Sequence, residues 1–181
     1  MPQASPEVKS SEAAPKEYSQ GQKKSSREQN IFGMEPEMER PVTIPQDVLA
    51  ILGNAPDVQE RCSIKTRSAK PIPPSWFVAS ELHLHSNSVA DLIVQPGEDD
   101  PCIGGMNITS YWVFQTLPLG HKLVLTNRSF GLKVMTTRTK GYRDIDMGSV
   151  TPGLGEVGTI YKFDGKKYRA VRNYRRPIRD N

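Results

Sequence analysis

The stretch Tyr161-Lys162-Phe163-Asp164-Gly165-Lys166-Lys167-Tyr168-Arg169-Ala170-Val171 decides the fold class of this chain. Two alternating, aromatic runs flank Asp164-Gly165. This dipeptide suits the two central positions of a type I′ turn, where both residues have positive φ. The segment therefore predicts a tight β-hairpin with Tyr161 and Phe163 on one face. Such a hairpin indicates that the folded part of the chain is strand-rich.

Further strand signals precede this hairpin at intervals of roughly 8–12 residues, a spacing typical of β-dominated domains. Each is a short apolar or alternating run, and Gly, Pro and Asn turn residues separate them. They cover residues 76–78, 81–85, 89–94, 111–114, 121–126, 132–136 and 143–147. The sequence therefore predicts a β-dominated α+β fold with seven or eight short, mostly antiparallel strands.

One helix is predicted before these strands, over residues 46–52. Its apolar residues Val48, Leu49 and Leu52 share one face. Pro45 is compatible with the first helical turn, and Gly53-Asn54 is a typical helix stop. Residues 56–61 could add one further helical turn. The predicted fold thus has one N-terminal helix that covers a face or an edge of the sheet.

Residues 1–42 differ in composition from the rest of the chain. They carry six Lys/Arg and seven Asp/Glu among many Ser, Gln and Pro residues. Such a segment buries too little apolar surface to offset the entropy lost on ordering. We therefore predict a disordered polar tail over 1–42, a single β-rich domain over 43–173 and a basic C-terminal tail over 174–181.

The sequence favours an extracytoplasmic setting. No apolar run reaches the roughly 18 residues that span a bilayer, so no transmembrane segment is expected. No apolar signal-peptide core is recognisable either, and we expect the signal peptide to be absent from this chain. The polar start matches a mature exported chain. Cys62 and Cys102 are expected to form a disulfide, which closes a loop of about 40 residues and adds roughly 3–4 kcal/mol of stability. Two separate buried thiols are the alternative, and a metal site is not indicated because the C-x-x-C spacing is missing.

His83 and His85 are the candidate metal ligands. On a strand their imidazoles would lie on one face, a geometry that metal sites use. The third ligand would come from His121, Asp91 or Glu81. A polar outer face of a half-buried strand explains the same pattern more simply, and no serine lies in G-x-S-x-G. We therefore expect no catalytic residue, no metal and no cofactor, with a His83/His85 metal-dependent enzyme as the alternative.

The C-terminal run is the most prominent surface feature. Residues 166–181 contain seven Lys/Arg and one Asp, with tyrosines interleaved. Basic residues with aromatics can bind nucleic acid. We consider nucleic acid a less favoured partner than an acidic protein or an anionic envelope surface. The remaining alternative is a C-terminus that only increases solubility and binds no partner. The residues assigned to this partner-binding surface are Tyr168, Arg169, Arg172, Tyr174, Arg175, Arg176 and Arg179.

Residues 120–172 resemble a recurring pattern in uncharacterised bacterial secreted or envelope proteins. The pattern combines Leu123-Val124-Leu125, Gly131-Leu132-Lys133-Val134, a Gly-Tyr-Arg-Asp-Ile bend at 141–145 and the hairpin at 161–168. Its motifs are structural and carry no catalytic residue. The resemblance implies an extracytoplasmic bacterial setting and a binding or accessory role. We therefore expect a non-enzymatic accessory protein, such as a subunit or inhibitor that docks on another protein.

Overall fold

A computed structural model describes residues 30–33, 38, 40–62, 72–86, 88–105, 107–151 and 155–177. Within them the chain forms nine strands, two α-helices and one 3-10 helix. The helical elements are α1 (Gln46–Gly53), α2 (Pro56–Cys62) and η1 (Pro74–Trp76). The strands are β1 (Ile31–Phe32), β2 (Phe77–Leu82), β3 (Asp91–Pro96), β4 (Thr109–Leu117), β5 (Gly120–Ser129), β6 (Leu132–Thr139), β7 (Tyr142–Thr151), β8 (Gly155–Phe163) and β9 (Tyr168–Arg176). The predicted β-dominated α+β class is confirmed.

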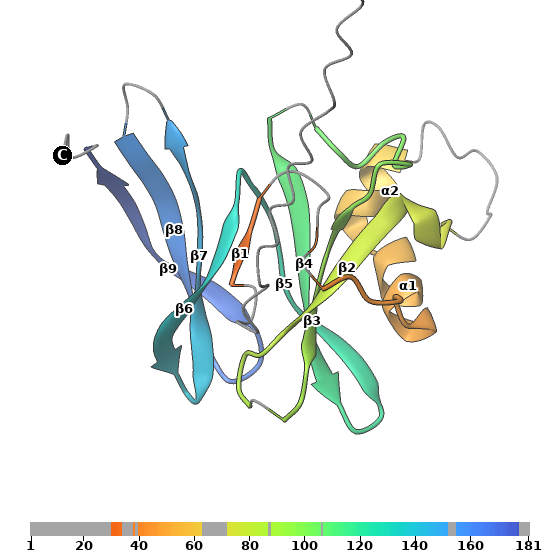
Figure 1. Cartoon of the computed structure of the whole chain (residues 1–181), viewed down its shortest axis with the longest axis horizontal. Helices are drawn as coiled ribbons and strands as arrows, with labels where there is room; N and C mark the ends of the chain where they lie inside the picture. The colour runs from red at the N-terminus through yellow and green to blue at the C-terminus, as the bar shows by residue number, and fades with distance from the viewer. Residues whose placement is uncertain are drawn as a thin grey trace, which may run out of the picture.

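The elements form three layers (Figure 1). The two helices cover one face of a four-stranded sheet with the order β2-β3-β4-β5, and a five-stranded sheet with the order β1-β6-β7-β8-β9 packs on its other face. All strand pairs are antiparallel. No helix in the described part of the chain is long and apolar enough to cross a membrane.

The four-stranded sheet is buried on both faces, which explains its apolar strands. Alternate residues of β4 enter different cores: Tyr111 and Val113 face the five-stranded sheet, whereas Trp112 and Phe114 face the helices. In β3 all six residues are buried. A strand buried on both faces needs apolar residues at successive positions. The unbroken apolar run within residues 89–94 therefore belongs to the middle layer.

The helical layer contains two helices where the sequence predicted one helix and a possible extra turn. The chain turns at Asn54, and α2 starts at Pro56, whose ring cannot continue a preceding helix. The predicted disulfide is present: Cys62, at the end of α2, is bonded to Cys102 with a Cα–Cα distance of 5.3 Å. The bridge ties α2 to the loop that leads into β4.

The C-terminal hairpin has the predicted strands but a different turn. β8 and β9 pair up to Phe163 and Tyr168, so the loop spans four residues. Only Gly165 has positive φ there, and the Asp164 carboxylate accepts the backbone N–H groups of Lys166 and Lys167. Two successive positive φ values occur instead at Lys140-Gly141, between β6 and β7. The prediction of a type I′ turn at Asp164-Gly165 is therefore wrong.

The folded domain includes residues that the sequence analysis placed in the tails. β1 pairs with β6, and the Phe32 side chain is only 2% exposed. The Tyr111 hydroxyl donates to the carbonyl oxygens of Phe32 and Gly33 at 3.1 and 2.6 Å. At the other end β9 continues to Arg176, beyond the boundary expected at 173. Residues 1–29 and Arg179 lie outside the described residues.

Candidate binding surface

β9 forms one edge of the five-stranded sheet and carries four arginines in nine residues. It pairs with β8, and in Figure 1 it is the outermost strand of that sheet. An edge strand presents backbone N–H and C=O groups to which a further strand can bind. β9 therefore combines a strand-pairing edge with a high density of positive charge.

The arginines of β9 flank this edge on both faces of the sheet. The register places Arg172 opposite Ile160 and Arg175 opposite Val157, with no irregularity between these two pairs. Because side chains alternate along a strand, the two residues point to opposite faces. Both side chains are exposed. A strand bound at this edge would thus meet positive charge on either side of its backbone.

Tyr168 does not belong to this exposed surface, contrary to the assignment from sequence. Its side chain is 4% exposed, and its hydroxyl donates to the Arg143 carbonyl oxygen at 2.7 Å. Its ring meets the Phe163 ring edge-on, with 5.4 Å between centroids. Burial raises the pKa of the Tyr168 phenol. The hairpin face that carries Tyr168 is the face that packs on the core, so this residue stabilises the fold.

Arg169 is engaged in the hairpin loop. Its Nε lies 3.0 Å from an Asp164 carboxylate oxygen, in an ion pair with both side chains partly exposed. The backbone N–H groups of Lys167 and Lys166, followed by Arg169, hold the pKa of Asp164 well below its usual range. Exposed ion pairs contribute little stability. The ion pair holds Arg169 beside the hairpin loop, and Arg172 and Arg175 are the two exposed arginines of β9 that we select to test partner contact.

Tyr174 and Arg176 are ordered parts of the sheet, although the sequence placed them in a basic tail. The Tyr174 hydroxyl donates to Asp146 at 2.8 Å. Arg176 lies 4.5 Å above the centroid of the Tyr174 ring and 3.4 Å from the Glu156 carboxylate. The ring lies over Gly158, where a Cβ atom would be only 2.6 Å from the tyrosine hydroxyl. The glycine thus provides the space that Tyr174 occupies.

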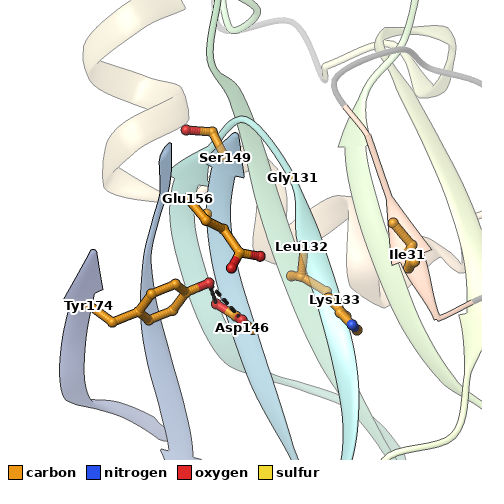
Figure 2. Close-up of a pocket in the computed structure, with 9 residues that line it drawn as sticks. Ile31, Gly131, Leu132, Lys133, Asp146, Ser149, Glu156 and Tyr174 are labelled. Atoms are coloured by element: carbon orange, nitrogen blue, oxygen red, sulfur yellow. Dashed lines mark hydrogen bonds between the residues drawn. The ribbon is translucent and has the colours of Figure 1, made fainter. Parts of the chain in front are cut away.

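A shallow recess of about 190 Å³ adjoins Tyr174 on the outer face of the five-stranded sheet. Figure 2 shows Tyr174 reaching across the sheet to Asp146, with Glu156 above the pair. Burial and the hydrogen bond to Asp146 raise the pKa of the Tyr174 phenol. Lys133 lines the opposite side of the recess. The recess thus carries both positive and negative side chains, which suit contacts with a polar surface and indicate no particular reaction.

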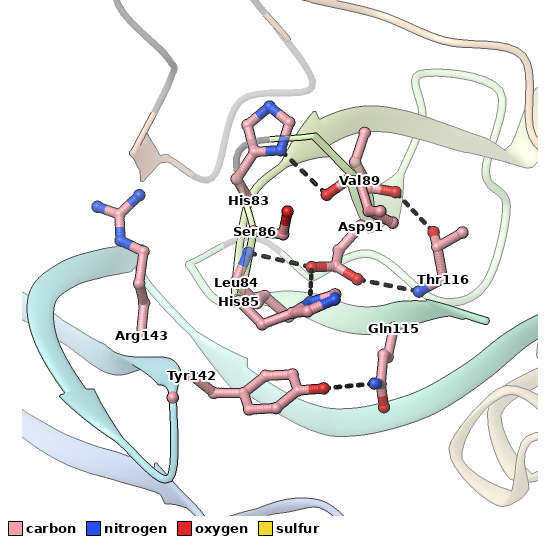
Figure 3. A network of polar contacts seen from close by, with 12 residues as sticks. His83, Leu84, His85, Ser86, Val89, Asp91, Gln115, Thr116, Tyr142 and Arg143 are labelled. Carbon is pink, nitrogen blue, oxygen red and sulfur yellow. Dashed lines mark hydrogen bonds and ion pairs between the residues drawn. The ribbon is translucent and has the colours of Figure 1, made fainter.

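The region of the predicted His83/His85 site is a loop organised by Asp91, because β2 ends at Leu82. The buried Asp91 carboxylate accepts the backbone N–H groups of Leu84 and Thr116 at 3.0 and 2.9 Å (Figure 3). His85 Nδ1 lies 3.3 Å from the same carboxylate. Asp91 therefore links the loop after β2 to the end of β4, and the prediction of a strand over 81–85 is wrong beyond Leu82.

The candidate metal ligands are not gathered into one site. The His83 ring contacts the carbonyl oxygen of Val89 at 3.1 Å. His121, a proposed third ligand, instead pairs with Asp47 of α1 at 2.9 Å. Among the described residues, no group of three or more His, Cys, Asp or Glu side chains could hold a metal ion. The geometry thus offers no support for the metal-dependent alternative.

No family model, curated protein or solved structure matches this chain. The functional assignment therefore depends on the geometry of the described residues. Two features of that geometry were missed from sequence: the contact between Tyr174 and Asp146, and the space over Gly158. Both require knowledge of strand register, since the residues come from three different strands.

Proposed function

We propose that this protein is a non-enzymatic, extracytoplasmic binding or accessory protein that docks on an acidic protein partner through the edge of β9. The observation that carries the proposal is the position of β9 at the sheet edge with exposed arginines on both faces. Strand addition at such an edge is a general mode of recognition, in which backbone hydrogen bonds give affinity and side chains give specificity.

The charge of β9 favours an acidic strand over a second copy of itself. Two copies of β9 side by side would bring arginines close together, and like charges on neighbouring strands are destabilising. Charged side chains on edge strands commonly prevent such self-pairing. An acidic partner strand would instead attract the arginines of β9. The positive charge at this edge therefore favours an acidic partner strand over a second copy of β9.

The disulfide supports the extracytoplasmic part of the proposal. Cys62 and Cys102 are bonded in the structure. Disulfides persist in oxidising compartments and are rare in the cytosol of most organisms. A secreted or envelope setting is consistent with this bond and with the resemblance of residues 120–172 to bacterial secreted or envelope proteins.

Charge reversal on β9 tests this proposal. A fluorescent peptide of alternating glutamate and valine should bind the protein, and anisotropy should report the affinity. The double variant Arg172→Glu/Arg175→Glu should bind at least about tenfold more weakly, because it places like charges across the interface. Binding by the unaltered protein should also weaken with added salt, because the contacts are exposed to solvent.

The double variant Lys122→Glu/Lys140→Glu is a matched control, since it changes net charge equally through exposed residues on β5 and in the turn between β6 and β7. It should retain most of the affinity. A proline-substituted acidic peptide, which cannot complete backbone pairing, should bind weakly. Equal binding of this peptide would contradict strand addition. Affinity for anionic vesicles alone would assign β9 to a membrane surface, and unchanged binding by the β9 variant would refute the role of these arginines.

A further inference from the structure

Four hairpin connections lie together at the lower end of the molecule in Figure 1: those between β2 and β3, β4 and β5, β6 and β7, and β8 and β9. The Tyr142 ring stacks on the ring of His85 in the first connection, with 5.0 Å between centroids. Its hydroxyl accepts a hydrogen bond from Gln115 of β4. Lys140 donates to the Asp164 carbonyl oxygen, which joins the third connection to the fourth. These contacts hold the four connections in one surface, here called the loop end.

Large apolar side chains are exposed at the loop end. Leu119, in the turn between β4 and β5, is fully exposed, and Leu117 is 40% exposed. Turn positions usually hold Gly, Pro, Asn, Asp or Ser, and a fully exposed leucine buries no apolar surface within the domain. Val89, in the neighbouring connection between β2 and β3, is 37% exposed. Single exposed apolar residues are common, but three of them at one end of the molecule form a candidate interaction surface.

The turn that carries Leu119 is held in a defined conformation. Its two central residues are Pro118 and Leu119, and Gly120 after them has a φ of 127°, which glycine adopts readily. The Asp47 carboxylate of α1 accepts the backbone N–H of His121 at 2.8 Å and pairs with its imidazole at 2.9 Å. Leu119 is therefore presented at a fixed position, which lowers the entropy lost when it binds a partner.

Lysines surround these apolar side chains. Lys122 follows the turn in β5, Lys140 lies between β6 and β7, and Lys166 and Lys167 lie between β8 and β9. All four are exposed. Among the described residues of the four connections, Asp164 is the only carboxylate, and it accepts the backbone N–H groups of Lys166 and Lys167. The loop end thus combines a projecting apolar tip with surrounding positive charge.

We propose that the loop end binds an anionic lipid surface, with Leu117 and Leu119 entering the interfacial region and the lysines contacting lipid phosphate groups. A lipid surface presents negative charge directly above an apolar layer, which matches lysines placed around a leucine tip. A projecting tip also fits a fluid layer that closes around it, whereas a protein partner would need a matching pocket. This surface is separate from the edge of β9, and the inference goes beyond the docking function.

Sedimentation with lipid vesicles tests this inference. The protein should bind saturably to vesicles of phosphatidylcholine and phosphatidylglycerol in equal parts. It should bind at least about tenfold more weakly to phosphatidylcholine alone, which carries no net charge. Leu119→Ser should weaken binding to the mixed vesicles at least about tenfold, because the leucine side chain no longer leaves water. This variant should fold normally, since Leu119 is fully exposed. The control Val171→Ser, at an exposed residue of β9, should leave vesicle binding unchanged.

Two charge-reversal variants separate this site from the edge of β9. Lys122→Glu/Lys140→Glu should weaken binding to the mixed vesicles at least about tenfold and retain binding of the acidic peptide. Arg172→Glu/Arg175→Glu should weaken binding of the peptide and retain most of the vesicle binding. Because both variants change net charge equally, any difference between them reports the position of the charge. Failure of the docking proposal and failure of this one are therefore distinguishable.

Three results would overturn the proposal. The first is no saturable binding to the mixed vesicles, which would leave the leucines to a protein partner. The second is unchanged binding of Leu119→Ser, which would indicate charge attraction without insertion. The third is loss of vesicle binding in Arg172→Glu/Arg175→Glu but not in Lys122→Glu/Lys140→Glu, which would assign the membrane contact to β9.

Discussion

Replacing Tyr168 with alanine should destabilise the domain by about 3–5 kcal/mol, the usual cost of removing a large aromatic side chain from a core. The Tyr168 ring is 4% exposed and packs with Phe163, Ile145 and their neighbours in the core between the two sheets. Its hydroxyl also satisfies the Arg143 carbonyl oxygen. The free energy of unfolding of a small domain is only about 5–15 kcal/mol. This single substitution should therefore remove a large share of the stability of the domain.

Urea unfolding followed by tryptophan fluorescence measures this effect. Tyr168→Phe should cost only about 1–3 kcal/mol, because it keeps the ring and leaves one buried carbonyl oxygen without its donor. Arg172→Ala, at an exposed position on the same strand, should change the free energy of unfolding by less than about 0.5 kcal/mol. A loss below about 1 kcal/mol for Tyr168→Ala would show that the ring does not belong to the core.

Removing the disulfide should produce the second large effect. The bond joins residues 40 positions apart, and the chain-entropy model assigns such a loop about 3–4 kcal/mol of stabilisation. The double variant Cys62→Ala/Cys102→Ala should therefore unfold at a clearly lower urea concentration than the oxidised protein. The cost arises mainly in the unfolded chain, which gains freedom when the loop is no longer closed.

Reductant provides the matched control for this prediction. It should destabilise the unaltered protein by a similar amount and should not affect the double alanine variant. Mass spectrometry after alkylation without reductant should find neither cysteine modified in the folded protein. Two alkylated thiols in the folded protein, together with unchanged stability on reduction, would contradict the bond and weaken the case for an oxidising compartment.

The fold was predictable where local sequence patterns and tertiary packing agree. The hairpin that ends in β9 follows from aromatic alternation, and α1 follows from its apolar spacing between Pro45 and Gly53. The turn was not predictable in detail, because the Asp164 carboxylate binds the loop backbone and favours four residues over two. β1 was also missed: two residues carry no periodic signal, and their place depends on β6 and on the hydroxyl of Tyr111.

The candidate surface was predictable only in its charge. The arginines of β9 are visible as a basic run, but their division between the two faces depends on the register with β8, which shifts at Ile160. Tyr168 and Tyr174 occur in the same run with opposite roles, one in the core and one over Gly158 on the outer face.

Hydrogen–deuterium exchange of the complex with the acidic peptide tests the central claim most directly. Backbone pairing at the edge should slow exchange of amides in β9, Tyr168–Arg176, when the peptide is saturating. Peptide fragments from β5, Gly120–Ser129, should exchange at the same rate with and without the ligand. Saturable binding that leaves the β9 amides unprotected, or that protects the other sheet instead, would contradict docking through the edge of β9.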